Sequence, residues 1–200
     1  MTTTISAKDV AELRRRTGTG MMECKKALQE SGGDMDKAMQ ILRKRGMAKA
    51  EQRADRSASE GVIGSYIHFN GKVGVLVDLN CETDFVARTD EFKNLAKNLS
   101  LHIASAKPMA VSVDDLPEAL VATERQIVEA QVAESGKPEA VQEKILAGKM
   151  KKFCQERALL DQPFVKDDKV SVGQLVKEAS AKLGENVVVR RFVRYELGEE

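Results

Sequence analysis

The sequence predicts an α+β protein in which a small helical bundle precedes a larger core with a three-stranded antiparallel sheet. Apolar residues recur at helical spacing through residues 6–46. Two apolar runs then flank Asn70-Gly71, a strong sequence signal for a β-hairpin. A third apolar run lies near the end of the chain. Because a two-stranded hairpin alone is only marginally stable, this third run is expected to complete the sheet.

Residues 1–56 are predicted to form a three-helix, ubiquitin-associated-like bundle with a basic linker helix. Ser6 and Asp34 are suited to cap the first and third helices, because their side chains can accept hydrogen bonds from free backbone amides. Gly18-Thr19-Gly20 is expected to separate the first two helices, and Gly46 to end the third. So small a bundle buries little surface, so we expect it to keep an apolar patch for a partner.

Residues 57–200 are predicted to form an α+β core that also carries the dimer contact. A type I′ turn is expected to join the hairpin strands 62–69 and 73–80, and the arginines of the third strand, Val187 to Tyr195, predict an edge position. The other expected elements are a helix capped by Thr89 with His102 on its core face, a helical hairpin within 117–160, a polar loop over 162–169, and a helix capped by Ser171 and ended by Gly184.

Composition limits the class of function. Lys and Arg number 32 against 31 Asp and Glu, so the chain lacks the basic excess typical of bulk nucleic-acid binding. The charge is uneven, since residues 1–56 hold 13 basic and 8 acidic side chains. No apolar run approaches the ~20 residues of a membrane span, so no membrane association is expected. Three widely spaced cysteines are typical of reduced thiols and predict a cytoplasmic protein.

No pattern for an active site is found in the sequence. It lacks a nucleophile–base set, a carboxylate pair on a rigid frame, a Walker loop and a cluster of metal ligands. Gly18-Thr19-Gly20 lies between helices rather than after a strand, so it is not a dinucleotide-binding turn. We therefore expect a binding protein rather than an enzyme, with no catalytic residue, no cofactor and no metal site.

The most informative stretch is 79–88, where an apolar strand gives way to a polar connection and then to a helix. Phe85 lies on this connection, although the chain has only six Phe, two Tyr and no Trp. The residues alone leave two interpretations open. The Phe85 side chain either packs under the sheet as core, or protrudes as an anchor for a partner, since functional residues are often carried on loops.

Two long segments resemble the signatures of a known family. Residues 80–88, NCETDFVAR, resemble the internal signature of elongation factor Ts, the guanine-nucleotide exchange factor of bacterial and organellar translation. Residues 13–28, LRRRTGTGMMECKKAL, resemble its N-terminal signature, at the family's usual spacing. The similarity continues through GSYIH at 64–68, KMKKF at 149–153, QPFVKDDKVSVGQLVKE at 162–178 and GENVVVRRF at 184–192, and the length resembles the short form with one core module.

The resemblance implies a translation elongation factor that binds elongation factor Tu in its GDP-bound and nucleotide-free states. It implies that this chain displaces Mg²⁺ and promotes GDP release so that GTP can rebind. It also implies a homodimer that gives a complex of two factors and two GTPases. The implied contacts are Thr83, Asp84, Phe85 and Val86 beside the nucleotide, an N-terminal patch of Leu13, Arg14, Met21 and Met22, and His68 and Leu183 in the core.

Two other functions remain open from the residues alone. The basic segment 43–56 is compatible with an RNA-binding accessory factor, but it lacks the interleaved aromatic side chains that stack bases. We therefore prefer to interpret it as a solvated linker helix and expect no direct nucleic-acid contact. The N-terminal bundle is also compatible with a ubiquitin-associated-like adaptor that carries an oligomerising tail.

Overall fold

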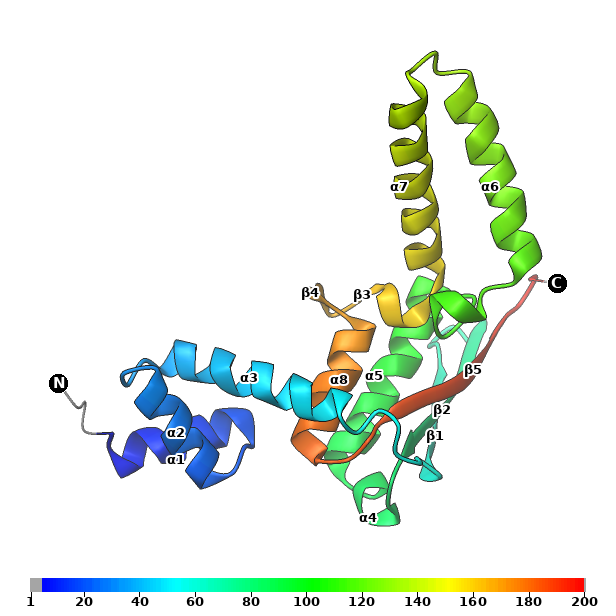
Figure 1. Cartoon of the computed structure of the whole chain (residues 1–200). Coiled ribbons are helices and arrows are strands. Elements are labelled where there is room, and N and C mark those ends of the chain that lie inside the picture. Colours follow the sequence, from blue (N-terminus) through cyan, green and yellow to red (C-terminus); the bar gives the residue numbers. More distant parts are fainter. Residues whose placement is uncertain (1–4, 200) are drawn as a thin grey trace. The chain divides into compact units, whose positions relative to one another are not determined.

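The structure is a computed structural model that describes residues 5–199. Its helices and its three-stranded antiparallel sheet confirm the predicted α+β class (Figure 1). The chain forms two compact units. The first holds the residues up to Gly61 with Cys81–Phe92 and Val176–Val188, and the second holds Val62–Asn80, Lys93–Leu175 and the residues from Val189 onward. A boundary at residue 56 stays a prediction, because two later segments are grouped with the N-terminal residues.

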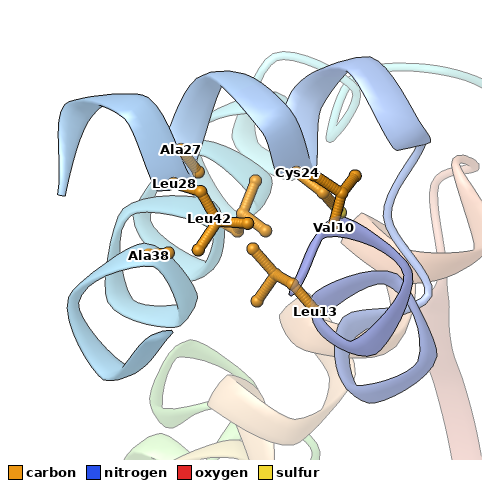
Figure 2. Close-up of a cluster of buried hydrophobic side chains, with 7 residues drawn as sticks. All are labelled: Val10, Leu13, Cys24, Ala27, Leu28, Ala38 and Leu42. Atoms are coloured by element: carbon orange, nitrogen blue, oxygen red, sulfur yellow. The ribbon is translucent and has the colours of Figure 1, made fainter. Parts of the chain in front are cut away.

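Three helices, α1 (Ala7–Thr17), α2 (Met21–Glu30) and α3 (Met35–Glu51), pack against one another in the first unit. Ser6 Oγ accepts a hydrogen bond from Asp9 N at 3.1 Å, and Asp34 Oδ1 accepts one from Lys37 N at 3.0 Å, so both predicted caps are confirmed. The side chains that meet between the helices are small or aliphatic (Figure 2): Val10, Leu13, Cys24, Ala27, Leu28, Ala38 and Leu42.

Gly46 does not end the third helix, contrary to the prediction. α3 continues to Glu51, and a Cβ at position 46 would lie 3.0 Å from Ala181 Cβ in α8 (Val172–Leu183). The glycine therefore permits close helix–helix packing. An ion pair of 2.5 Å between Arg43 and Glu178 joins the same two helices, which explains why residues 176–183 belong to the first unit.

The sheet has the strand order β1-β2-β5, formed by β1 (Glu60–Ile67), β2 (Val73–Cys81) and β5 (Val188–Glu196). The predicted hairpin and the edge position of the last strand are confirmed. The prediction of a type I′ turn is wrong. Such a turn needs a positive φ at both central residues, and Gly71 has a φ of +68° whereas Asn70 does not have a positive φ. The loop instead closes with Gly71 N donating to His68 O at 2.8 Å, as in the longer hairpin loops built around a type I turn.

Helix α5 (Asp90–Ala106) begins at the predicted cap, since Thr89 Oγ1 accepts a hydrogen bond from Phe92 N at 3.3 Å. A Cβ at Gly64 would lie 3.0 Å from Ala96 Cβ, so the glycine lets β1 approach this helix closely. The predicted apolar face of α5 is buried throughout: Phe92, Leu95, Ala96, Leu99, His102 and Ile103.

The helical hairpin is confirmed as α6 (Glu118–Ala133) and α7 (Glu139–Arg157), which Figure 1 shows side by side. Residues 162–169 are not a simple loop as predicted, because β3 (Pro163–Phe164) and β4 (Asp167–Ser171) pair antiparallel there. Ser171 Oγ accepts from Gln174 N at 3.1 Å and Gly184 has a φ of +78°, so both predicted ends of α8 are confirmed. Short 3-10 turns at Val113–Asp115 and Leu159–Asp161 flank the helical hairpin.

His102 is a satisfied core histidine, as predicted, with 1% of its surface exposed. Its Nδ1 accepts a hydrogen bond from Val165 N at 3.2 Å, so the ring proton is on Nε2, which donates to Gln162 Oε1 at 2.9 Å. Burial lowers the pKa of His102, and the bond to Gln162 opposes this effect. The neutral ring is therefore the form that fits the fold.

Acidification should destabilise the protein through His102. Because its pKa is lower in the folded state, its contribution is complete above the unfolded value of about 6.5 and is lost as the pH falls toward the folded value. His102→Gln should flatten the dependence of the unfolding free energy on pH between about pH 7 and 5 by at most ~1.4 kcal/mol per pH unit. Equal slopes for His102→Gln and the original chain would contradict this account.

Candidate functional site

The connection after β2 contains a four-residue helix, α4 (Asp84–Ala87), which the sequence did not resolve from its surroundings. Thr83 caps it, since Thr83 Oγ1 accepts a hydrogen bond from Val86 N at 3.4 Å. The side of α4 that carries Ala87 is buried, whereas Phe85 is 78% exposed. The interpretation of Phe85 as a core residue is therefore wrong, and its side chain protrudes from the first unit.

The carboxylate of Glu185 contacts the residues that precede α4. Its Oε2 accepts hydrogen bonds from the backbone N–H groups of Glu82 and Thr83, both at 3.0 Å. Its Oε1 accepts a hydrogen bond from Thr83 Oγ1 at 2.6 Å. Hydrogen bonds to an ionised carboxylate are stronger than those between neutral groups. The short helix that carries Phe85 is therefore tied to a segment about a hundred residues further along the chain.

The side chains of Cys81 and Asp84 also form contacts at α4. Burial raises the pKa of the Cys81 thiol to about 11, and the negative charge of Glu185 adds to the rise. Cys81 therefore stays a thiol that donates to Thr83 O at 3.2 Å, rather than a nucleophile. Asp84 forms an ion pair of 2.8 Å with Arg88 on the next turn and keeps 44% of its side chain exposed. Asp84 is thus available to a partner beside Phe85.

A second surface lies at the start of α2. Met21 is 46% and Met22 is 66% exposed, and Arg14 and Met21 line one shallow hollow. Leu13 does not belong to this surface. Its side chain is fully buried among the three helices, because it lies one helical position away from Arg14 and faces Cys24 and Leu28 rather than solvent (Figure 2). Leu13 therefore supports the patch from within.

Lys182 lies beside the loop before α2 and beside the start of α5, within the first unit. Its Cε would lie 3.0 Å from a Cβ at Gly18, in the loop that precedes Met21. Its Nζ forms an ion pair of 2.5 Å with Glu91, which follows α4 in the chain. The protruding Phe85 and the methionine patch are thus parts of one compact unit.

The two core candidates differ in their surroundings. Leu183 is half-buried at the end of α8 and belongs to the first unit. His68 is half-buried in the second unit, where its Nδ1 lies 2.9 Å from Tyr66 Oη and its ring centroid lies 4.4 Å from that of Phe69. The structure therefore groups Leu183, but not His68, with the residues around Phe85.

Sequence reasoning missed the residues that hold the site together. Glu185 and Asn186 lie within the segment that resembles the family, but neither periodicity nor spacing assigned them a role. Lys182 likewise looked like an ordinary charge in the last turn of a helix. Their importance arises from contacts between residues far apart in the sequence, and a local pattern carries no signal for such contacts.

The described chain contains neither a metal centre nor a membrane span. Among residues 5–199, no group of His, Cys, Asp and Glu side chains is arranged to hold a metal ion. Within the same described part, no helix is both long and apolar enough to cross a membrane. The exposed apolar side chains of the first unit include an isolated aromatic residue, Phe85, and the methionines Met21 and Met22, residue types that are common at protein–protein contacts.

Comparison with known proteins gives one family over nearly the whole chain. The family model described as "Elongation factor TS" matches residues 3–199. A protein of Moorella thermoacetica named elongation factor Ts is 54% identical over 195 residues, which cover 98% of this chain and 96% of that protein. Proteins with the same name from Thermosipho melanesiensis (98% of this chain, 100% of that protein) and Rubrobacter xylanophilus (94% and 96%) are 53% and 54% identical. The chain therefore belongs to the elongation factor Ts family.

Proposed function

We propose that this chain is the guanine-nucleotide exchange factor of elongation factor Tu. It binds the GDP-bound GTPase, displaces Mg²⁺ and promotes GDP release, so that GTP can rebind. Membership of the family supports this function. The single structural observation that carries the mechanism is Phe85, which protrudes from a short helix whose preceding backbone is fixed by Glu185. A rigid support of this kind suits a side chain that must enter a partner.

In the proposed mechanism, Thr83, Asp84, Phe85 and Val86 enter the GTPase beside the nucleotide. Phe85 fills an apolar pocket there, which shifts the elements that hold Mg²⁺ and loosens the phosphate end of GDP. No bond is made or broken by this chain, so the function is one of coupled binding rather than of chemical catalysis. Coupling is reciprocal: the factor by which this protein lowers GDP affinity is the factor by which GDP lowers the affinity for this protein.

Phe85 alone cannot supply the binding free energy that GDP release requires. Lowering the affinity of the GTPase for GDP by a factor of about 10⁴ needs about 5.5 kcal/mol of differential binding free energy. Burying one phenylalanine supplies about 1.5–3 kcal/mol. The remainder must come from other contacts, for which Arg14, Met21 and Met22 are placed at the surface of the same unit. His68 and Leu183 are further proposed contacts.

The function is tested by the release of fluorescent GDP from elongation factor Tu in an excess of unlabelled nucleotide. Addition of this protein should increase the release rate until it saturates with factor concentration. A rate that stays at the spontaneous value at every factor concentration would contradict the proposed function.

An RNA-binding function has less support, because four of the six basic side chains in segment 43–56 already face carboxylates. Arg43 lies 2.5 Å from Glu178 and Arg45 lies 2.6 Å from Glu30. Lys49 and Arg56 also face carboxylates, those of Glu23 and Glu82. A phosphate backbone would have to compete with these carboxylates. Retardation of single-stranded RNA at physiological salt would revive this alternative.

We further propose a homodimer, and one face of the sheet supports it. Gly64 faces Ala96 of α5, so Ile63 on β1 points away from that helix. A Cβ at Gly74 would lie 3.2 Å from Ile67 Cδ1, which places both on the same outer face. The exposed apolar side chains of these strands are Ile63, Ile67, Leu76, Val193 and Tyr195. Such a face, which lacks a covering helix in the described second unit, is suited to bury itself against a second copy.

The dimer is tested by light scattering over a dilution series. The expected result is a reversible equilibrium between the 22.0 kDa chain and a species of twice that mass, and a complex of two factors with two GTPases. Pairing of the β5 edges is a second route to a dimer, and Tyr195→Ser distinguishes the two, because it should weaken the face contact without removing backbone groups from that edge. A 22.0 kDa species at every concentration, bound one-to-one, would contradict the dimer but not the exchange function.

A further inference from the structure

The geometry points to Glu185 as the residue that positions Phe85 for nucleotide exchange, a role that rests on the proposed function. Glu185 lies after α8, about a hundred residues from Phe85 in the sequence. Its carboxylate nevertheless makes three hydrogen bonds, of 3.0, 3.0 and 2.6 Å, to the two residues that lead into α4. It is a positioning residue, since the contacts connect it with Phe85 through Thr83.

The three donors around this contact suit a carboxylate, which accepts hydrogen bonds at both of its oxygens. The N–H groups of Glu82 and Thr83 converge on one oxygen, Oε2, and consecutive backbone amides of this kind form a concavity that favours an anion. The Thr83 hydroxyl donates its single proton to Oε1. The lone pairs of the hydroxyl oxygen are thereby left to accept the hydrogen bond from Val86 N that caps α4. One carboxylate thus fixes both the backbone before α4 and the orientation of its cap.

Helix α4 needs such a support because it is too short to be stable alone. A helix of four residues has barely closed its first turn, and nucleation of a helix is unfavourable. Phe85 contributes little packing of its own, since 78% of it is exposed. The direction in which Phe85 points is therefore set by its cap and by what holds the cap in place.

Glu185 is itself held in place by a reciprocal set of contacts. The backbone oxygen of Glu185 accepts a hydrogen bond from Ser180 Oγ at 2.5 Å. The next residue, Asn186, donates its backbone N–H to Glu82 Oε1 at 2.7 Å. Its side-chain Nδ2 donates to the carbonyl oxygens of Ala54 and Arg56 at 3.0 and 2.8 Å. Segments 82–83 and 185–186 therefore hold each other in place, and these contacts orient the Glu185 carboxylate toward the residues before α4.

Removing the carboxylate should slow exchange without abolishing association. Glu185→Ala should lower the maximal rate of GDP release by roughly 10- to 100-fold, the loss expected when a functional group is displaced by about 1 Å. The factor concentration at half-maximal rate should change much less, because the methionine patch is untouched. Glu185→Gln should restore part of the rate, since its amide oxygen can accept the two backbone N–H groups and its NH₂ can donate to Thr83 Oγ1.

A double-mutant cycle with Phe85→Ala separates positioning from general damage. If Glu185 acts through Phe85, Glu185→Ala should have no further effect on release in the Phe85→Ala background. If Glu185→Ala lowered the rate of GDP release in the Phe85→Ala background by the same factor as in the original chain, the inference would be overturned. Glu129→Ala is the matched control, because it makes the same substitution at a glutamate on α6, where the carboxylate forms an ion pair with Arg125 at 2.9 Å and is 50% exposed. It should behave as the original chain.

A measurement without the GTPase decides the inference even if the proposed function fails. In the free protein, Glu185→Ala should accelerate amide hydrogen exchange at Glu82, Thr83 and Val86 by at least about tenfold, while amides of the α1–α3 bundle keep their original rates. If the hydrogen-exchange rates of these three amides were the same in Glu185→Ala as in the original chain, the positioning role would be overturned. If the original chain does not speed GDP release, the exchange function fails by itself, and the amide rates still show whether Glu185 orders α4.

Discussion

Phe85→Ala should lower the maximal rate of GDP release by about 10- to 100-fold while leaving complex formation with elongation factor Tu detectable. The magnitude follows from the about 1.5–3 kcal/mol that the side chain gains when it is buried in a partner. The fold should tolerate the change, because 78% of Phe85 is exposed in the free protein. Fluorescent GDP release at saturating factor measures the effect.

The control is Met109→Ala, which removes another exposed large apolar side chain, 54% accessible, at a position that is not among the proposed contacts. It should release GDP at the original rate. Unchanged release with Phe85→Ala, or equal losses for the two variants, would falsify the specific role of Phe85.

Leu13 and Met22 should give opposite results, although both belong to the predicted N-terminal patch. Leu13→Ala should lower the unfolding free energy by about 2–5 kcal/mol, because its side chain is fully buried in the small bundle. Met22→Glu should leave stability within about 0.5 kcal/mol, since the side chain is 66% exposed, but should weaken association about 10- to 100-fold. Denaturant unfolding and a binding titration measure the two quantities.

Gln40→Glu is the control for Met22→Glu, because it places the same charge at an exposed position of α3 in the same bundle. It should change neither stability nor binding. These point variants are better tests than removal of residues 1–56, since that deletion would also uncover Glu178 and Ala181 of α8. An association constant for Met22→Glu equal to that of the original chain would show that the patch does not bind the GTPase.

Local signals predicted much of the fold because they act between near neighbours. The caps at Ser6, Asp34 and Ser171 bind backbone amides three residues further on, so a short window of sequence is sufficient to find them. The face of α5 likewise follows from helical periodicity alone. These predictions are confirmed because the side chain and its partner belong to the same element.

The features that the sequence did not predict depend on tertiary contacts. Gly46 resembles a helix end by its composition, but in the structure it makes room for Ala181. Leu13 belongs to a family signature, yet the packing of three helices buries it. The contact between Thr83 and Glu185 joins residues about a hundred positions apart, so it is recognised only when the chain is folded. The location of the candidate site was thus predictable, but its support was not.

The central claim, that this protein and GDP oppose each other on elongation factor Tu, is tested most directly by a titration of the GTPase with this protein at a series of GDP concentrations. The account predicts that the apparent dissociation constant rises as GDP is added, and levels off at a ratio equal to the ratio of GDP affinities measured with and without this protein. An apparent dissociation constant that does not depend on GDP would contradict the account.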